Sequence, residues 1–221
     1  PGVAGRRRAS GVRARARTLF RRKPCVRLVR EPPRLARVPL CYPCPMRELA
    51  DIDIMGDDLL ARRMTGASLA ILSLGMTACV LAWAVGAGEA VGLGWFALLA
   101  LVALASFATH ELVHAVAFKA LGGADVRVSF GFKAGMLYTS AAGAVLSRPR
   151  FVAVLLAPAA VLSVLLPVAC SLLARPLLGW AAFAIHLAGC VGDLAMVREI
   201  CRTPACTHVR DTEDGIVLLG E

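Results

Sequence analysis

The stretch VGLGWFALLALVALASFATHELVHAVAF, from Val91 to Phe118, is long and apolar enough to cross a hydrocarbon core, which takes about 20 residues. Near its end it carries His110, Glu111 and His114, three groups that are hard to solvate in such surroundings. An ionisable group inside a membrane span is a functional candidate by default. This stretch therefore indicates both the class of fold and the place to look for a function.

Three further apolar segments predict an all-α membrane protein with about four transmembrane helices. The chain has 221 residues and is 58% hydrophobic, which is more than a soluble globular domain usually carries. The other predicted spans are Met64–Gly88, Phe151–Ala174 and Pro176–Val197. The four helices would form one domain over residues 64–198 and leave residues 199–221 as a short cytoplasmic tail.

The net charge of +10 originates in the N-terminal part of the chain. Residues 1–63 contain 16 Lys and Arg against 6 Asp and Glu, whereas residues 64–221 contain 9 of each. The head is rich in Arg and Pro, and we predict residues 1–63 to be a basic, disordered segment. It could be an over-extended gene model or a solvated arm, or a polybasic segment attracted to anionic lipid. No nucleic-acid partner is predicted.

The basic residues between the spans predict the orientation. They cluster before the first span, between the second and third spans, and after the fourth, whereas the other two loops hold only Arg175. By the positive-inside rule, both termini and the central loop are cytoplasmic. We therefore expect an integral, multi-pass protein of a prokaryotic cell membrane, with the lipid bilayer as a partner.

The motif H-E-L-V-H has a spacing that suits zinc chemistry. On a helix with 3.6 residues per turn, His110 and His114 lie about 40° apart and one turn from each other, so both can ligate one ion. Glu111 is the next residue round the helix, outside the ligand face but close enough to reach a water on the ion. Zinc lowers the pKa of such a water, and the carboxylate takes its proton. The alternative is a structural pair of histidines that bond to neighbouring helices, with Glu111 as their acceptor.

A zinc site with one open position needs a third protein ligand, and the stretch HLAGCVGDL in the fourth span offers two candidates. His114 lies five residues before Lys119, and Asp193 lies five before Arg198, so both are about 7 Å from the cytoplasmic end of a helix. His186 is roughly 10 Å further in, too far to share the ion unless the helix breaks. We therefore predict Asp193 as the third ligand, against the alternative of an exposed helix-end carboxylate, and a packing or supporting role for His186.

Two glycines in the same stretch, Gly189 and Gly192, form a small-x-x-small pair. Without a Cβ atom at these positions, another helix can come close to the backbone. We therefore expect the fourth span to approach a partner helix closely at this point.

With this set of residues, the sequence resembles the site-2 protease class of intramembrane zinc metalloproteases. It is more similar still to a group of four-span zincin peptidases with an H-x-x-G-x-x-G-D signature, which the stretch HLAGCVGD matches. The resemblance covers residues 64–221 and implies a zinc peptidase with His110, His114 and Asp193 as ligands and Glu111 as base. Site-2 proteases usually carry Asp followed by Gly near an Asn-Pro, whereas Gly precedes Asp here. The chain contains no Asn or Gln, so an amide side chain is excluded as an oxyanion donor.

The central loop predicts a small cytoplasmic β-hairpin between the second and third helices. The segment DVRVSFGFK alternates apolar and polar residues, and a turn at KAG leads to the return strand MLYT. An open hairpin edge beside the zinc could hold an extended substrate by strand addition, and a hairpin that only caps the helices is an equal alternative. Tyr138 and backbone N–H groups are the remaining candidates to stabilise an oxyanion.

These features favour a membrane-embedded zinc metallopeptidase that hydrolyses peptide bonds in membrane or juxtamembrane segments of a membrane protein or peptide. The alternative is a non-enzymatic membrane metal-binding protein, either a transporter or an inactive scaffold. A transporter needs polar groups along its whole pathway, whereas here they cluster at one depth. The sequence indicates neither the substrate and its cleavage position nor the regulatory partners and oligomeric state.

Overall fold

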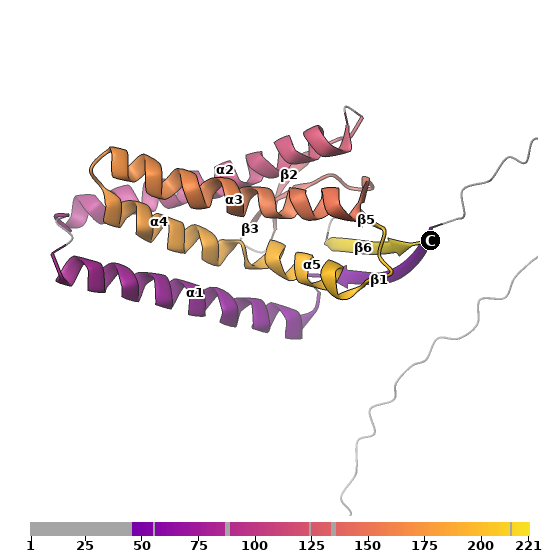
Figure 1. Ribbon diagram of the computed structural model, residues 1–221, viewed down its shortest axis with the longest axis horizontal. Coiled ribbons are helices and arrows are strands. Elements are labelled where there is room, and N and C mark those ends of the chain that lie inside the picture. Colours follow the sequence, from indigo (N-terminus) through magenta and orange to yellow (C-terminus); the bar gives the residue numbers. More distant parts are fainter. Residues whose placement is uncertain (1–45, 55, 87–88, 124, 134–135, 213) are drawn as a thin grey trace, which may run out of the picture. The chain divides into compact units, whose positions relative to one another are not determined.

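Figure 1 shows the computed structural model, in which the described residues are 46–54, 56–86, 89–123, 125–133, 136–212 and 214–221. All of them belong to one compact unit that spans Pro43–Glu221. Most of the predicted basic segment, residues 1–45, lies outside the described residues. The described chain is mostly helical and carries two small antiparallel sheets.

The helices run side by side along the length of the molecule (Figure 1). They are α1 (Asp58–Ala84), α2 (Leu93–Gly122), α3 (Arg148–Leu172), α4 (Pro176–Gly189) and α5 (Val191–Arg202). The first three are each long and apolar enough to cross a membrane, and α4 with α5 makes a fourth such stretch with a bend of 48°. The four predicted spans therefore correspond to α1, α2, α3 and the α4–α5 pair, with shifted ends.

Helix α1 begins earlier than the expected Met64 because a capping residue precedes it. The side chain of Asp57 accepts hydrogen bonds from the backbone nitrogens of Leu59 and Leu60, at 2.9 and 3.0 Å. These two N–H groups have no partner within the helix, and an aspartate at this position satisfies them. The first turn of α1 therefore lies inside the segment that we predicted to be disordered.

A four-stranded antiparallel sheet at one end of the helices was not predicted, so the all-α class is too narrow. Its order is β1 (Arg47–Asp53), β6 (Gly215–Gly220), β5 (His208–Asp211) and β4 (Val145–Ser147). Strand β1 is hard to recognise because only Leu49 and Ile52 of its residues pack against the core. The sheet joins segments that precede α1, connect α2 to α3, and follow α5, so residues 199–221 are more than a tail.

The predicted hairpin between the second and third long helices is confirmed. It consists of β2 (Ser129–Lys133) and β3 (Met136–Ser140), with Phe130 opposite Thr139 and Phe132 opposite Leu137. Among the strands that the structure describes, β3 pairs only with β2, so its second edge is free of strand partners. Strand β3 also contacts α2, which carries His110, Glu111 and His114.

A buried carboxylate ties the loop before α2 to the start of α4, at the end of the helices away from the sheet. One oxygen of Glu89 accepts a hydrogen bond from Trp95 Nε1 at 3.0 Å, and the other accepts from the backbone nitrogens of Leu177 and Leu178. Arg175 lies 3.6 Å from the same carboxylate. Because the first N–H groups of a helix lack internal partners, Glu89 fixes where α4 begins.

Candidate metal centre

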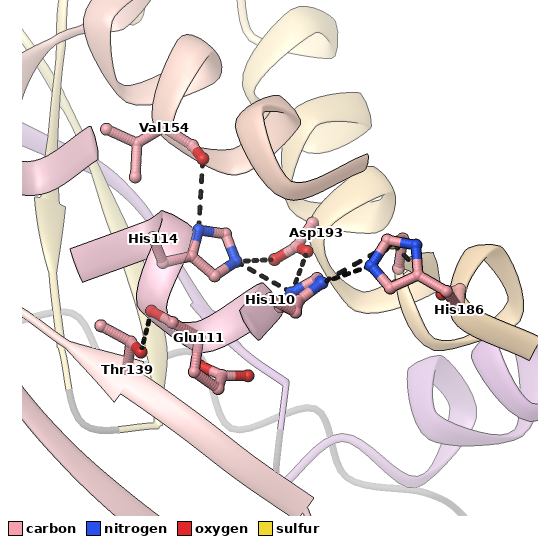
Figure 2. Close-up of polar contacts among 8 residues, drawn as sticks. His110, Glu111, His114, Thr139, Val154, His186 and Asp193 are labelled. Atoms are coloured by element: carbon pink, nitrogen blue, oxygen red, sulfur yellow. Dashed lines mark hydrogen bonds and ion pairs between the residues drawn. The ribbon is translucent and has the colours of Figure 1, made fainter. Parts of the chain in front are cut away.

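Helix α2 presents two buried histidines one turn apart. The Nε2 atoms of His110 and His114 are 3.1 Å from each other, and only 8% and 6% of the two residues is exposed. The spacing of four residues therefore brings two imidazole nitrogens to one point among the helices, as Figure 2 shows.

Helix α5 brings a carboxylate to the same point. Asp193 Oδ2 lies 3.2 Å from His110 Nε2, and Asp193 Oδ1 lies 3.4 Å from His114 Nε2. Asp193 is buried rather than exposed at a helix end, and it occupies the first turn of α5. The positive end of the helix dipole favours a carboxylate there.

The bend between α4 and α5 and a close helix approach together set this position. Helix α4 ends at Gly189, and the backbone nitrogen of Cys190 bonds to the carbonyl oxygens of both His186 and Leu187 at 3.1 Å. A Cβ atom on Gly189 would lie 2.8 Å from the ring of Phe107 on α2. The close approach that we predicted therefore occurs at Gly189, which meets α2 at Phe107, about one turn before His110. Gly192 faces only an ordinary contact with Met64, at 3.7 Å.

Both histidines of α2 use Nδ1 for a second partner behind the cluster. His114 Nδ1 lies 3.2 Å from the carbonyl oxygen of Val154 on α3, and His110 Nδ1 lies 3.1 Å from Nε2 of His186 on α4. A carbonyl oxygen can only accept, so the proton of neutral His114 is on Nδ1. Its Nε2 lone pair is then directed at Asp193, as a metal ligand requires.

The two imidazoles and the carboxylate are close enough together for a tetrahedral zinc site. Ligand atoms at 2.0–2.1 Å from a tetrahedral ion are about 3.3 Å from one another. The two Nε2 atoms are 3.1 Å apart, and they lie 3.2 and 3.4 Å from different oxygens of the Asp193 carboxylate. Two imidazoles and one carboxylate bind zinc and leave a coordination position open. These three residues would hold the ion.

A cavity of about 200 Å³ adjoins the ligand atoms and is also lined by Glu111. The backbone oxygen of Glu111 accepts a hydrogen bond from Thr139 Oγ1 on β3, at 2.9 Å. In Figure 2 no dashed line joins the Glu111 carboxylate to the histidines or to Asp193. The alternative of a structural histidine pair required Glu111 to accept hydrogen bonds from both histidines, and the Glu111 carboxylate does not do so here. Further lining comes from the hairpin, α1, α5 and the β5–β6 turn, including Met64, Leu137, Tyr138, Met196, Asp211 and Asp214.

His186 and Tyr138, the two remaining residues that the sequence analysis singled out, do not lie among the ligand atoms. His186 does not join His114 and Asp193, but reaches the far nitrogen of His110 because the helix breaks after Gly189. Tyr138 lines the cavity, although its ring lies over Gly131, where a Cβ atom would be 2.4 Å from the Tyr138 hydroxyl oxygen. Because Gly131 has no side chain, the Tyr138 ring can lie against β2.

Asp211 is a cavity residue that the sequence analysis missed. Its carboxylate accepts hydrogen bonds from Ser140 Oγ at 3.0 Å and from the backbone nitrogen of Ala141 at 2.7 Å. Burial raises the pKa of the Asp211 carboxyl to about 6, although these two hydrogen bonds act in the opposite direction. An aspartate before an acidic turn carries no signal of such a role, since its partners are about 70 residues away in the sequence.

Comparison with protein families matches the central and C-terminal part of the chain. Residues 102–208, just under half of the chain, match the model of a family described as "Putative zincin peptidase". The matched segment contains His110, Glu111, His114, His186 and Asp193. The match indicates a zinc metallopeptidase. No curated protein and no solved structure significantly matches this chain.

Proposed function

We propose that this protein is a membrane-embedded zinc metallopeptidase that hydrolyses peptide bonds in membrane or juxtamembrane segments. The family match supports peptidase activity and zinc, and the convergence of two histidines and an aspartate supports their role as its ligands.

Apolar side chains on the outer faces of the long helices support the membrane location. Leu74 on α1, Leu104 on α2 and Val164 on α3 are 75%, 69% and 64% exposed. They belong to a larger set of exposed apolar residues on the same helices. Soluble monomers rarely expose contiguous apolar surface of this extent, whereas lipid tails accept it without cost.

The four-stranded sheet supports the proposed orientation. Strands of one sheet lie on one side of a membrane, so the segments before α1, between α2 and α3, and after α5 share a side. An even number of crossings between these segments satisfies that condition, as four spans do with α4 and α5 counted together. The basic residues of the same segments assign that side to the cytoplasm.

The reaction divides between the ligand cluster and Glu111. A zinc ion held by the cluster would polarise the substrate carbonyl and lower the pKa of a water that it coordinates. Glu111 lines the same cavity without belonging to the ligand set, so it accepts the proton of the attacking water. The same carboxyl group then donates a proton to the leaving amine, which completes hydrolysis.

The hairpin supplies a place for an extended substrate. Strand β3 has an edge without a strand partner among the described residues, and Leu137, Thr139 and Ser140 on β3 line the cavity. A substrate strand added to that edge would form main-chain hydrogen bonds beside the ligand cluster. Because a helix uses its backbone N–H and C=O groups for internal hydrogen bonds, the substrate segment must unwind before it can pair with β3. The backbone N–H groups of β3 are then placed to stabilise an oxyanion.

The observation that carries this proposal is that Glu111 lines the same cavity as the ligand cluster but is not one of the ligands. The test compares cells that express the wild-type chain with cells that express Glu111→Gln at the same level, in a strain lacking the protein. Newly formed peptide termini in membrane proteins are measured by mass spectrometry. We expect termini within or beside transmembrane segments that depend on Glu111.

If neither strain forms termini beyond those of the host that lacks the protein, with zinc retained in both proteins, the non-enzymatic alternative is favoured. The same new termini in both strains would contradict the role of Glu111. Termini far from any membrane segment would contradict the proposed class of substrate while leaving the peptidase assignment in place.

A further inference from the structure

The ring of His186 lies directly behind one of the candidate ligands. His186 is completely buried, and its Nε2 is 3.1 Å from Nδ1 of His110. Figure 2 shows this contact on the side of His110 that faces away from Asp193. The imidazole of His110 thus has one nitrogen towards the ligand cluster and the other towards His186.

Hydrogen-bond accounting places one proton between the two rings, on Nδ1 of His110. A nitrogen that binds a metal must be unprotonated, so neutral His110 carries its proton on Nδ1 and donates it to His186 Nε2. His186 then carries its own proton on Nδ1; Cys190 Sγ lies 3.8 Å from this nitrogen and 3.6 Å from Nε2, so the sulfur does not distinguish between the two. The Cys190 thiol in turn lies 3.3 Å from the carbonyl oxygen of His186, to which it donates.

The arrangement parallels that of the second candidate ligand. His114 has the carbonyl oxygen of Val154 behind it, at 3.2 Å. The two rings of α2 therefore have acceptors from two different helices, α3 for His114 and α4 for His110. An acceptor behind a metal-binding imidazole fixes its tautomer and its orientation.

We propose that His186 is a positioning residue of the metal centre: by accepting the Nδ1 proton of His110, it holds His110 Nε2 towards Asp193 and His114. This inference rests on the metal site of the proposed function, but not on peptide hydrolysis. The two helices on either side of the break after Gly189 then both contribute to the metal centre, since α4 supplies His186 and α5 supplies Asp193.

A different use of the same atoms makes a contrasting prediction. His110, His186 and Cys190 also lie close enough to one another to surround an ion. In that arrangement, His110 Nδ1 would lose its proton and bind metal, and Cys190 would be a ligand. A neutral imidazole cannot offer both nitrogens, so occupancy of this second group competes with the hydrogen bond to His186.

The experiment measures zinc affinity in detergent by competition with a chelating dye. His186→Leu keeps an apolar side chain but removes the acceptor, and we expect zinc affinity to fall roughly 10- to 100-fold. His186→Gln places an acceptor oxygen near the position of Nε2, and we expect it to restore most of that affinity. His208→Leu is the matched control, because His208 lies on β5 outside the centre and pairs with Thr207.

Two results would overturn the inference. One is wild-type zinc affinity in His186→Leu, and the other is an affinity in His186→Gln no better than in His186→Leu. If His186→Leu does not fold, the visible spectrum of bound cobalt is compared between His186→Gln and wild type. The two spectra should agree, and a changed spectrum would contradict the inference, since a displaced His110 changes the coordination geometry. Cys190→Ala should still bind one zinc per chain, and a lost ion in that variant would support the second group instead.

These outcomes are separable from failure of the proposed function. If His110→Ala with His114→Ala still binds zinc, the metal site itself is wrong. If that double variant loses zinc while His186→Leu does not, only the role of His186 is wrong. An absence of peptidase activity leaves the result for His186 unchanged.

Discussion

The Asp211 carboxylate accepts a hydrogen bond from the backbone nitrogen of Ala141 at 2.7 Å, across the gap between the two sheets. Two backbone bonds add to this contact, one from the nitrogen of Gly143 to the oxygen of Asp211 and one from the nitrogen of Asp211 to the oxygen of Ala144, both 3.0 Å long. The end of β3 is therefore fastened to β5. The hairpin strand that borders the cavity is held by the segment that follows α5.

This relationship predicts a pH-dependent stability. Burial raises the pKa of Asp211 from 3.8 to about 6, so the folded state binds this proton more tightly than the unfolded state does. The stabilising contribution of Asp211 is therefore complete below pH 3.8 and is lost as the pH rises through about 6. We expect Asp211→Asn to remove this component, which amounts to about 3 kcal/mol. Thermal unfolding in detergent between about pH 3.5 and 7 measures it as the difference between the two proteins.

Ser140→Ala is the control for that experiment. It removes one hydrogen bond to Asp211 but leaves the carboxyl group, so its stability should still depend on pH. Parallel stability profiles for wild type and Asp211→Asn would show that Asp211 titrates normally, and would contradict the prediction.

The ligand cluster predicts one zinc per chain. Three protein ligands with one open position make a single site, and purified protein should hold about one zinc ion. His110→Ala combined with His114→Ala should abolish this content, as measured by elemental analysis after gel filtration. An unchanged zinc content in the folded double variant would end the assignment.

Glu111 and Asp193 should differ in their effect on the metal. Glu111→Gln should keep zinc and lose peptide hydrolysis, because the amide keeps the shape of the side chain but cannot accept a proton. Asp193→Ala should lose zinc affinity, because it removes one of three ligands. Zinc content and cleavage of a verified substrate are measured on the same preparations. Equal zinc loss in both variants, or wild-type cleavage by Glu111→Gln, would refute the division of roles.

The glycines of the bent region should respond differently to a methyl group. Gly189→Ala places a Cβ atom 2.8 Å from the ring of Phe107, and the resulting overpacking should cost about 1–3 kcal/mol and weaken zinc binding. Gly192→Ala meets only Met64 at an ordinary distance of 3.7 Å, so it should be tolerated. The two variants are compared by thermal unfolding and zinc competition. A larger effect at Gly192 would show that the α2–α4 approach does not set the site.

The orientation has its own test. Reporter fusions placed after Lys119 and at the C-terminus should be cytoplasmic, whereas a fusion near Glu89 should be external. The sheet requires the first two to give the same answer, because β4 and β5 pair with each other. An external central loop would reverse the assigned sides and place the cavity at the opposite face of the membrane.

The helices and the hairpin follow from local sequence patterns. An apolar run of about 20 residues and an alternating stretch before a turn each report on neighbouring residues only. The depth comparison that selected Asp193 likewise needed only helix geometry and the positions of Lys119 and Arg198. Its conclusion places Asp193 beside both histidines, as the structure does.

The four-stranded sheet and the contact of His186 depend on distant parts of the chain. Strand β1 carries few packed residues, and its partner β6 follows all the helices, so no local period reveals the pair. The bend at Cys190 involves no proline, so the usual sequence signal of a helix break is missing. Straight-helix geometry then misplaces His186 relative to His110.

The position of β6 between β1 and β5 has a consequence for biosynthesis. Strand β1 is made before any helix, and it remains unpaired until β6 has been made after all of them. The β5–β6 turn also supplies Asp214 and Gly215 to the cavity wall. A nascent chain therefore contains the complete H-E-L-V-H helix before the residues that form this wall of the cavity have been synthesised.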